Sequence, residues 1–219
     1  EQIEAKLKEF NGKAPKKGAS VSPKKTSPSS AKGKALFASK EVSQGTPGQS
    51  IDIAVDLKGA KELHLVANDA GNGYACDWAN WVNPRLVDAA GKETKLTSMK
   101  WSFASSGWGS VKLNQNASGG AMKVKGKAVE GIGTHANSLI SYKLPANHKF
   151  TRFLAVGALD DGGARQGACG SQASVQFQVF AQKPPFFGGA VSVSAAKGRG
   201  GRVGDQGDPA RAVENLDVH

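Results

Sequence analysis

The sequence of 219 residues lacks any apolar run that approaches the roughly 18 residues of a membrane-spanning helix. Its longest stretches, such as Phe153 to Val156, have the length of a strand. Cysteine is equally scarce, with only Cys76 and Cys169, and neither a CxxC pair nor a histidine cluster indicates zinc. These absences argue against an integral membrane protein and against a zinc domain.

Catalytic signatures are also missing, because no Ser/His/acid or Cys/His set occurs in its usual local context. Asp160 and Asp161 are neighbours, and adjacent strand residues point to opposite faces, so a turn or a salt bridge is favoured over paired catalytic carboxylates. Gly131 and Gly133 do not form a phosphate loop, because no helix and no suitably placed lysine follow them. We therefore expect that this segment is not an enzyme.

The formal net charge of +11 is uneven along the chain. Residues 1–46 hold 10 lysines and 4 glutamates, residues 47–183 hold 15 basic and 10 acidic residues, and the tail is neutral. The basic segment lacks the interleaved aromatics of a single-strand nucleic-acid site. A lysine-rich linker is favoured, and nucleic acid is not an expected partner. The alternative is a basic arm for nucleic acid or an anionic surface.

The ends of the chain differ in composition from its middle. Residues 1–10 place Ile3, Leu7 and Phe10 on one helical face and predict the end of a preceding helix. Residues 11–46, rich in Lys, Pro and Ser, predict a disordered linker. Residues 184–219 predict a glycine-rich linker and the start of a following domain, since Asp208-Pro209 resembles a helix start.

The middle, residues 47–183, alternates apolar and polar residues in short runs separated by Gly, Asn, Asp and Pro. This pattern predicts an all-β fold, an antiparallel sandwich rather than a βαβ sheet. The expected strands are 51–57, 62–67, 81–87, 96–103, 111–113, 122–124, 139–143, 151–159 and 173–181.

Four ordered motifs lie in this middle region: Gly131-Ile132-Gly133-Thr134-His135-Ala136, Phe150-Thr151-Arg152-Phe153, the acidic turn Asp160-Asp161, and the closing strand Ser174 to Phe180. Together they resemble the NPCBM family of carbohydrate-binding modules over residues 47–183. One departure is Ala173, where the family usually has glycine; it ends an insert that begins at Ala164.

The resemblance implies a jelly-roll β-sandwich of the galactose-binding-like type, found as an accessory module of larger exported bacterial proteins. Some members bind galactose-type sugars, and some carry a structural calcium. The expected function is therefore non-catalytic binding of a glycan that tethers an attached enzyme domain in the same polypeptide.

Sugar sites pair aromatic rings, which stack on C–H faces, with polar groups that bond hydroxyls. On this basis Trp78, Trp108, Asn114 and His135 are the predicted carbohydrate-binding residues. His135, which we expect in a glycine-bracketed turn, could instead cap neighbouring backbone groups. Trp81 and Trp101 follow strand alternation and are expected in the core rather than the site.

Asp69, Asn72 and Asp77 lie in or beside a glycine-rich loop, and grouped oxygen donors of this kind are typical of a structural calcium site. Asx turns use the same residues without metal, so both interpretations stay open. Cys76 and Cys169 are either a disulfide or two independent thiols, because pairing requires a Cα separation that sequence does not give.

The alternative function is a structural or protein-interaction sandwich that acts as a spacer. The tail from Asp208 to His219 faintly resembles the lead-in to exported multidomain dehydrogenases or haem proteins of planctomycete-type bacteria. In that interpretation the chemistry belongs to attached domains, and the protein is again expected to be exported.

Overall fold

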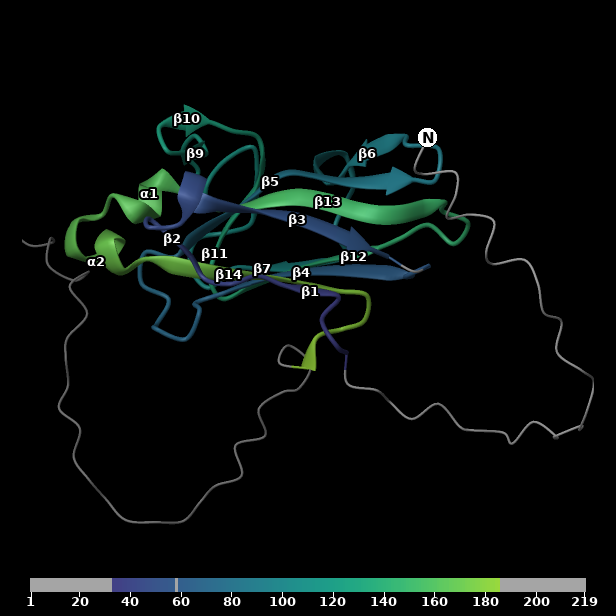
Figure 1. Ribbon diagram of the computed structural model, residues 1–219, viewed down its shortest axis with the longest axis horizontal. Coiled ribbons are helices and arrows are strands. Elements are labelled where there is room, and N and C mark those ends of the chain that lie inside the picture. Colours follow the sequence, from purple (N-terminus) through teal and green to yellow (C-terminus); the bar gives the residue numbers. More distant parts are fainter. Residues whose placement is uncertain (1–32, 58, 186–219) are drawn as a thin grey trace, which may run out of the picture.

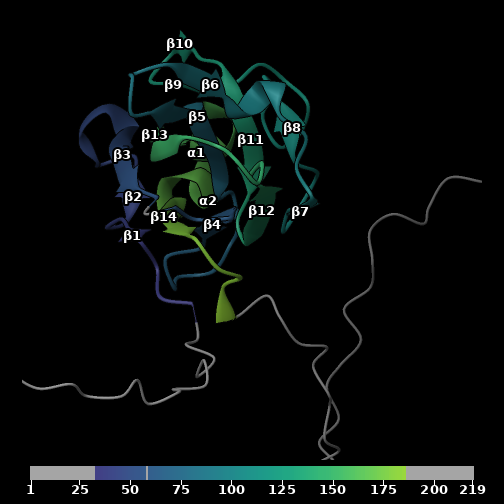
Figure 2. The ribbon, with the colours of Figure 1, turned by 90° about the vertical axis from the view of Figure 1, so that its right-hand side faces the viewer.

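A computed structural model describes residues 33–57 and 59–185. Two antiparallel sheets face each other across a hydrophobic core, and Figures 1 and 2 show them as the two layers of a sandwich. The predicted all-β antiparallel sandwich is thereby confirmed. The predicted helix at 1–10 and most of the predicted segments 11–46 and 184–219 lie outside the described residues.

The first sheet has the order β1-β14-β4-β12-β7, and β2 also pairs with β14. Its strands are β1 (Phe37–Ala38), β2 (Val42–Ser43), β4 (Glu62–Asn68), β7 (Phe103–Ser105), β12 (Ser138–Lys143) and β14 (Ser174–Phe180).

The second sheet has the order β3-β13-β5-β11-β8, and β6 also pairs with β5. Its strands are β3 (Ser50–Asp56), β5 (Trp78–Asp88), β6 (Glu93–Lys95), β8 (Lys112–Leu113), β11 (Gly131–His135) and β13 (Phe150–Leu159). The long strands β5 and β13 lie side by side at its centre.

The core is built from the inward side chains of both sheets. Trp81 on β5 is fully buried, and its ring contacts Phe177 of the opposite sheet edge-on, with centroids 4.9 Å apart. Phe153 and Tyr142 are buried to the same extent, whereas Trp101 is partly buried against the same core. The prediction that Trp81 belongs to the core is confirmed.

Several local predictions need correction. Strands β1 and β2 pair with β14, so the sandwich begins before residue 47 and the predicted linker 11–46 ends earlier than expected. The stretch 96–103 is not a strand: it opens with a 3-10 turn, η2 (Leu96–Ser98), and only Phe103 reaches β7. A second 3-10 turn, η1 (Pro47–Gln49), precedes β3.

The motif Gly131 to His135 is also not a turn. It forms the fully buried strand β11 between β5 and β8. Its glycines serve close packing, because a Cβ on Gly133 would lie 2.1 Å from the carbonyl oxygen of Gln115 and one on Gly131 would lie 2.0 Å from that of Trp81. The glycine spacing that suggested a turn therefore reflects crowding inside a sheet.

One end of the sandwich carries two short helices, α1 (Asp161–Ala164) and α2 (Gly167–Gln172), and the small hairpin β9 (Lys123–Val124) and β10 (Lys127–Ala128). Figure 1 shows these elements gathered at its left-hand end. The helices occupy the predicted insert 164–173 and the acidic turn before it.

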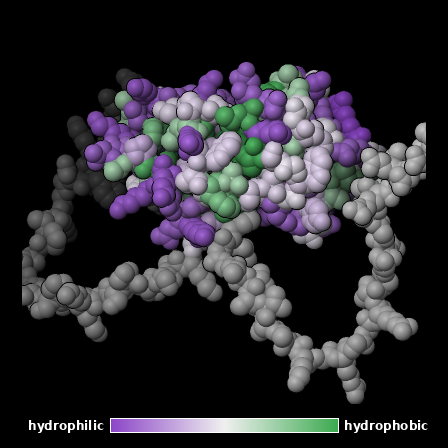
Figure 3. Space-filling model, turned by 180° about the vertical axis from the view of Figure 1, so that it is seen from behind, coloured by the Kyte–Doolittle hydropathy of each residue, from purple (hydrophilic) through white to green (hydrophobic). Residues whose placement is uncertain are grey.

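In the described ranges, no helix has both the length and the apolar character to span a membrane. Figure 3 shows the molecule from behind, where hydrophilic residues surround smaller groups of hydrophobic ones.

Candidate functional site

A pocket of about 350 Å³ lies at the end of the sandwich that carries α2. Its walls come from the loop before β5, the start of β5, the loop between β7 and β8, the end of β11 and the region of α2. The lining residues are Tyr74, Ala75, Cys76, Trp78, Trp108, His135, Gln166 and Cys169.

A pair of stacked tryptophans dominates this pocket. The rings of Trp78 and Trp108 have centroids 5.6 Å apart and an interplanar angle of 20°. Trp78 is half-buried at the start of β5, whereas Trp108 is 51% exposed in the loop between β7 and β8. Trp78 thus supports one face of a ring that is still largely open to solvent.

The Trp108 loop is shaped by close contact with β11 and with the 114–120 loop. The backbone N–H of His135 donates to Ser106 Oγ at 3.0 Å, and that hydroxyl donates to the carbonyl of Trp108 at 2.6 Å. Glycine is required on both sides of the tryptophan. A Cβ on Gly107 would lie 2.2 Å from the carbonyl oxygen of Ala136, and a Cβ on Gly109 would lie 2.3 Å from that of Ala117.

His135 lies beside the aromatic rings of Trp108 and Tyr74. It pairs with Trp78 across β11 and β5, and its ring centroid is 5.9 Å from that of Trp108 and 6.2 Å from that of Tyr74. Its Nδ1 bonds the carbonyl oxygen of Ala136, and since a carbonyl only accepts, Nδ1 carries the proton. Nε2 of the neutral ring is then an acceptor.

Burial lowers the pKa of His135 below 6.5, although the hydrogen bond to Ala136 opposes this shift. The imidazole is therefore neutral at physiological pH, and Nε2 can accept a hydrogen bond at that pH.

A disulfide joins Cys76 and Cys169, whose Cα atoms are 5.9 Å apart. Both cysteines line the pocket. The bond ties the loop that carries Tyr74 to helix α2, which follows Gln166. Of the two sequence interpretations, the structure shows the disulfide.

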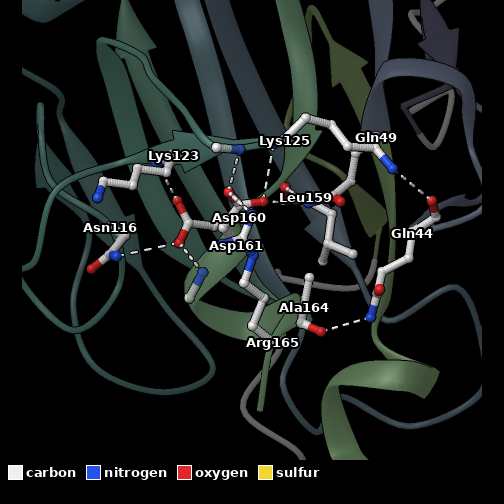
Figure 4. A network of polar contacts seen from close by, with 12 residues as sticks. Gln44, Gln49, Asn116, Lys123, Lys125, Leu159, Asp160, Asp161, Ala164 and Arg165 are labelled. Atoms are coloured by element: carbon white, nitrogen blue, oxygen red, sulfur yellow. Dashed lines mark hydrogen bonds and ion pairs between the residues drawn. The ribbon is translucent and has the colours of Figure 1, made fainter. Parts of the chain in front are cut away.

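The acidic pair beside the pocket is structural (Figure 4). Asp160 is fully buried, and its carboxylate accepts four hydrogen bonds. Oδ1 accepts from Gly162 N at 2.8 Å and from Asn116 Nδ2 at 3.2 Å. Oδ2 accepts from Asn80 Nδ2 at 2.6 Å and from Lys123 N at 3.0 Å. This carboxylate caps α1 and links it to β5, β9 and the 114–120 loop.

Asp161 continues the network on the other side of α1. Its carboxylate accepts from Lys125 N at 3.0 Å, Gly126 N at 2.7 Å and Gln49 Nε2 at 3.2 Å, and it forms an ion pair with Arg165 at 3.1 Å. The expectation of a turn or salt bridge, rather than paired catalytic carboxylates, matches this geometry.

Asn114 lies outside the pocket. It is exposed, with a φ of 54°, and its Oδ1 accepts from the N–H of Gly131 at 3.0 Å. It borders a separate small depression with Asn83 and Glu130. Three of the four predicted sugar-binding residues, Trp78, Trp108 and His135, are therefore brought together, and the fourth is not.

The three residues predicted to hold calcium are used separately. Asp69 accepts from Gly71 N in an Asx turn and bonds Asn137, and exposed Asn72 donates to the carbonyl of Gln172 at 3.3 Å. Asp77 is fully buried and accepts from Ser174 N at 2.8 Å. Within residues 33–57 and 59–185, no group of three His, Cys, Asp or Glu side chains is arranged to hold a metal.

Burial raises the pKa of Asp77 to about 7, against the opposing effect of the Ser174 N–H. A carboxyl group with this pKa is only about half ionised at pH 7, whereas calcium prefers ionised carboxylates. Asp69 forms the Asx turn that the sequence also allowed, through its bond from Gly71 N.

Gln166 and the two cysteines line the pocket, and sequence reasoning did not place them there. Gln166 lies in the insert between α1 and α2, and its Nε2 donates to the carbonyl of Gly162 at 2.8 Å. Because the cysteines are 93 residues apart, the sequence does not show that both lie beside the aromatic residues of the pocket. Cys76, only two residues before Trp78, was the one available signal.

The fold and the pocket define a class of protein: a small β-sandwich with an aromatic site at one end of its sheets and no catalytic constellation among the residues that form it. The chain belongs to the NPCBM family of carbohydrate-binding modules, since the NPCBM/NEW2 domain model matches residues 30–87 and 92–199. Neither the curated proteins nor the solved structures gave a match. The family is one of binding modules, which supports a non-enzymatic role for this segment.

Proposed function

We propose that this domain binds a glycan by taking a neutral terminal sugar into the pocket around Trp108. The observation that carries the proposal is the stacked pair Trp78–Trp108, whose outer ring is 51% exposed beside the acceptor of His135. An exposed ring offers a flat apolar face for sugar C–H groups, and Nε2 accepts a hydrogen bond from a sugar hydroxyl.

The lining favours an uncharged ligand. None of the eight lining residues is Asp, Glu, Lys or Arg, and His135 is neutral. The guanidinium of the nearby Arg165 is paired with Asp161. A sulfate or carboxylate group on the bound sugar would lose hydration without gaining a counter-ion, which is costly.

The size of the pocket suits one or two sugar rings, since about 350 Å³ is at the small end of the range for small-molecule sites. Among neutral sugars we propose a galactose-type ligand, on the basis of the family resemblance. Binding one terminal sugar gives modest affinity. The domain then acts by raising the local concentration of an attached enzyme domain on a glycan surface.

Export is part of the same proposal. Disulfides persist in oxidising compartments and are rare in the cytosol, and both cysteines of this chain form one. The Cys76–Cys169 bond therefore supports a periplasmic, cell-surface or secreted location.

The test compares Trp108→Ala with Phe103→Ala in calorimetric titrations with galactose, lactose and other neutral sugars. Phe103 is a matched control, because it is 52% exposed and lies on β7 outside the pocket lining. We expect Trp108→Ala to weaken binding at least tenfold, or about 1.4 kcal/mol, and Phe103→Ala to leave it unchanged. Failure of the unmodified domain to bind any neutral sugar would favour the spacer function instead.

A further inference from the structure

Two glycines of helix α1 lie directly against Trp78. A Cβ added to Gly162 would stand 2.6 Å from Cζ3 and 2.8 Å from Cε3 of the Trp78 ring. A Cβ added to Gly163 would stand 3.0 Å from Cβ and Cγ of the same side chain and 2.2 Å from the carbonyl oxygen of Cys76. Real Cβ atoms do not approach other atoms as closely as the shortest of these distances.

We propose that Gly162 and Gly163 are positioning residues for the sugar platform. They make the first layer of a stack in which the glycines of α1 support Trp78, and Trp78 supports Trp108. Neither glycine is among the residues that line the pocket. The inference rests on the proposed function, because Trp108 is the surface that is positioned.

The first layer of this stack is fixed by hydrogen bonds. Backbone N–H of Asp160 donates to the carbonyl of Trp78 at 2.8 Å, so α1 begins beside the strand residue that it supports. The buried carboxylate of Asp160 and the largely buried carboxylate of Asp161 then hold α1 to β5, to the β9–β10 hairpin and to η1. Figure 4 shows Asp160 and Asp161 at the start of the helix, with the contacts of Asp160 to Asn116 and Lys123 and that of Asp161 to Lys125.

Because α1 is held on several sides, it cannot move away to accommodate a methyl group at position 162. The indole of Trp78 has to move instead, and its movement changes the ring against which Trp108 stacks. Outside such a contact, alanine is favoured over glycine inside a helix by about 1 kcal/mol. A harmful effect of Gly162→Ala therefore reports the contact and not helix propensity.

The experiment measures Gly162→Ala for sugar affinity, thermal unfolding and far-ultraviolet circular dichroism, the range in which the strong indole transitions couple. Stacked indoles give an exciton couplet, and Trp108→Ala supplies the reference spectrum without it. We expect Gly162→Ala to diminish the couplet and to weaken sugar binding at least tenfold. Gly45→Ala is the matched control, because a Cβ there meets only Ser43 Oγ, at 3.8 Å.

The added methyl would also approach Asp160 Oδ1 at 2.8 Å. The contact with Trp78 is separated from this one by making Gly162→Ala in a variant that lacks the Trp78 ring. With Trp78→Ala already present, the loss of Tm caused by Gly162→Ala should fall to less than half of its value in the unmodified domain. Equal losses in the two backgrounds would assign the effect to Asp160 and overturn the inference, as would an unchanged couplet.

The spectroscopic result does not depend on a ligand. A couplet that is lost in Gly162→Ala, in a domain that binds no sugar, would support the positioning role while refuting the proposed function. A couplet and an affinity that both survive the substitution would refute the positioning role alone.

Discussion

Removing the Cys76–Cys169 disulfide should strongly destabilise the domain. The two cysteines are 93 residues apart in sequence, and their Cα separation of 5.9 Å lies within the usual range for a disulfide. For a loop of this length, the chain-entropy relation gives a stabilisation of about 4.6 kcal/mol at 25 °C. For a domain of this size, that free energy corresponds to a fall in Tm of roughly 10–18 °C.

The assay is thermal unfolding followed by far-ultraviolet circular dichroism, applied to the oxidised protein and to Cys76→Ala/Cys169→Ala. Adding a reducing agent should lower the Tm of the unmodified domain and leave that of the double variant unchanged. Sugar binding should weaken in parallel, because the bond joins the Tyr74 loop to α2 at the pocket wall.

A fall in Tm below about 3 °C would refute this reasoning, because even half of the calculated stabilisation would exceed it. That result would mean that the two segments are already held together by other contacts. The candidates are the bond from Asn72 Nδ2 to the carbonyl of Gln172, at 3.3 Å, and the bond from Ser174 N to Asp77 Oδ1, at 2.8 Å.

Two further predictions concern buried carboxyl groups. Asp160→Ala should destabilise the domain by about 3 kcal/mol or more in chemical unfolding, because it deprives four hydrogen-bond donors of their acceptor. Asp52→Ala, at an exposed position of β3, is the control and should cost much less. Asp77, whose pKa rises from 3.8 to about 7 on folding, binds its proton more tightly in the folded state, so its contribution to stability falls as pH rises between about 4 and 7. Asp77→Asn should remove that part of the pH dependence. The check is the free energy of unfolding from urea titrations at pH 4, 5.5 and 7. If the variant and the unmodified domain depend on pH in the same way, the raised pKa of Asp77 is wrong.

Much of the fold was predictable because it depends on local pattern. The alternation of Ile51, Ile53 and Val55 marks a strand with one buried face, and β3 occupies those residues. The same logic predicted β12, β13 and β14 within one or two residues. The prediction of a strand at 96–103 was wrong at its start. Leu96 is fully buried but lies in a 3-10 turn, and an apolar residue can be buried in a tight turn as well as in a strand.

The strands β1 and β2 were missed for a different reason. Each has only two residues and exists by pairing with β14, more than 130 residues later in the chain. A segment so short has no periodicity of its own to read, and its conformation depends on a partner that is distant in sequence.

By itself the sequence determined the sandwich, its core tryptophan Trp81, and the residue types of a sugar site, since all three follow from side-chain chemistry and strand period. Only the tertiary structure decided that Trp78, Trp108 and His135 meet while Asn114 does not, because they come from separate strands and loops. It also decided that the scarce cysteines pair beside that site, since a disulfide depends on Cα separation rather than on distance along the chain.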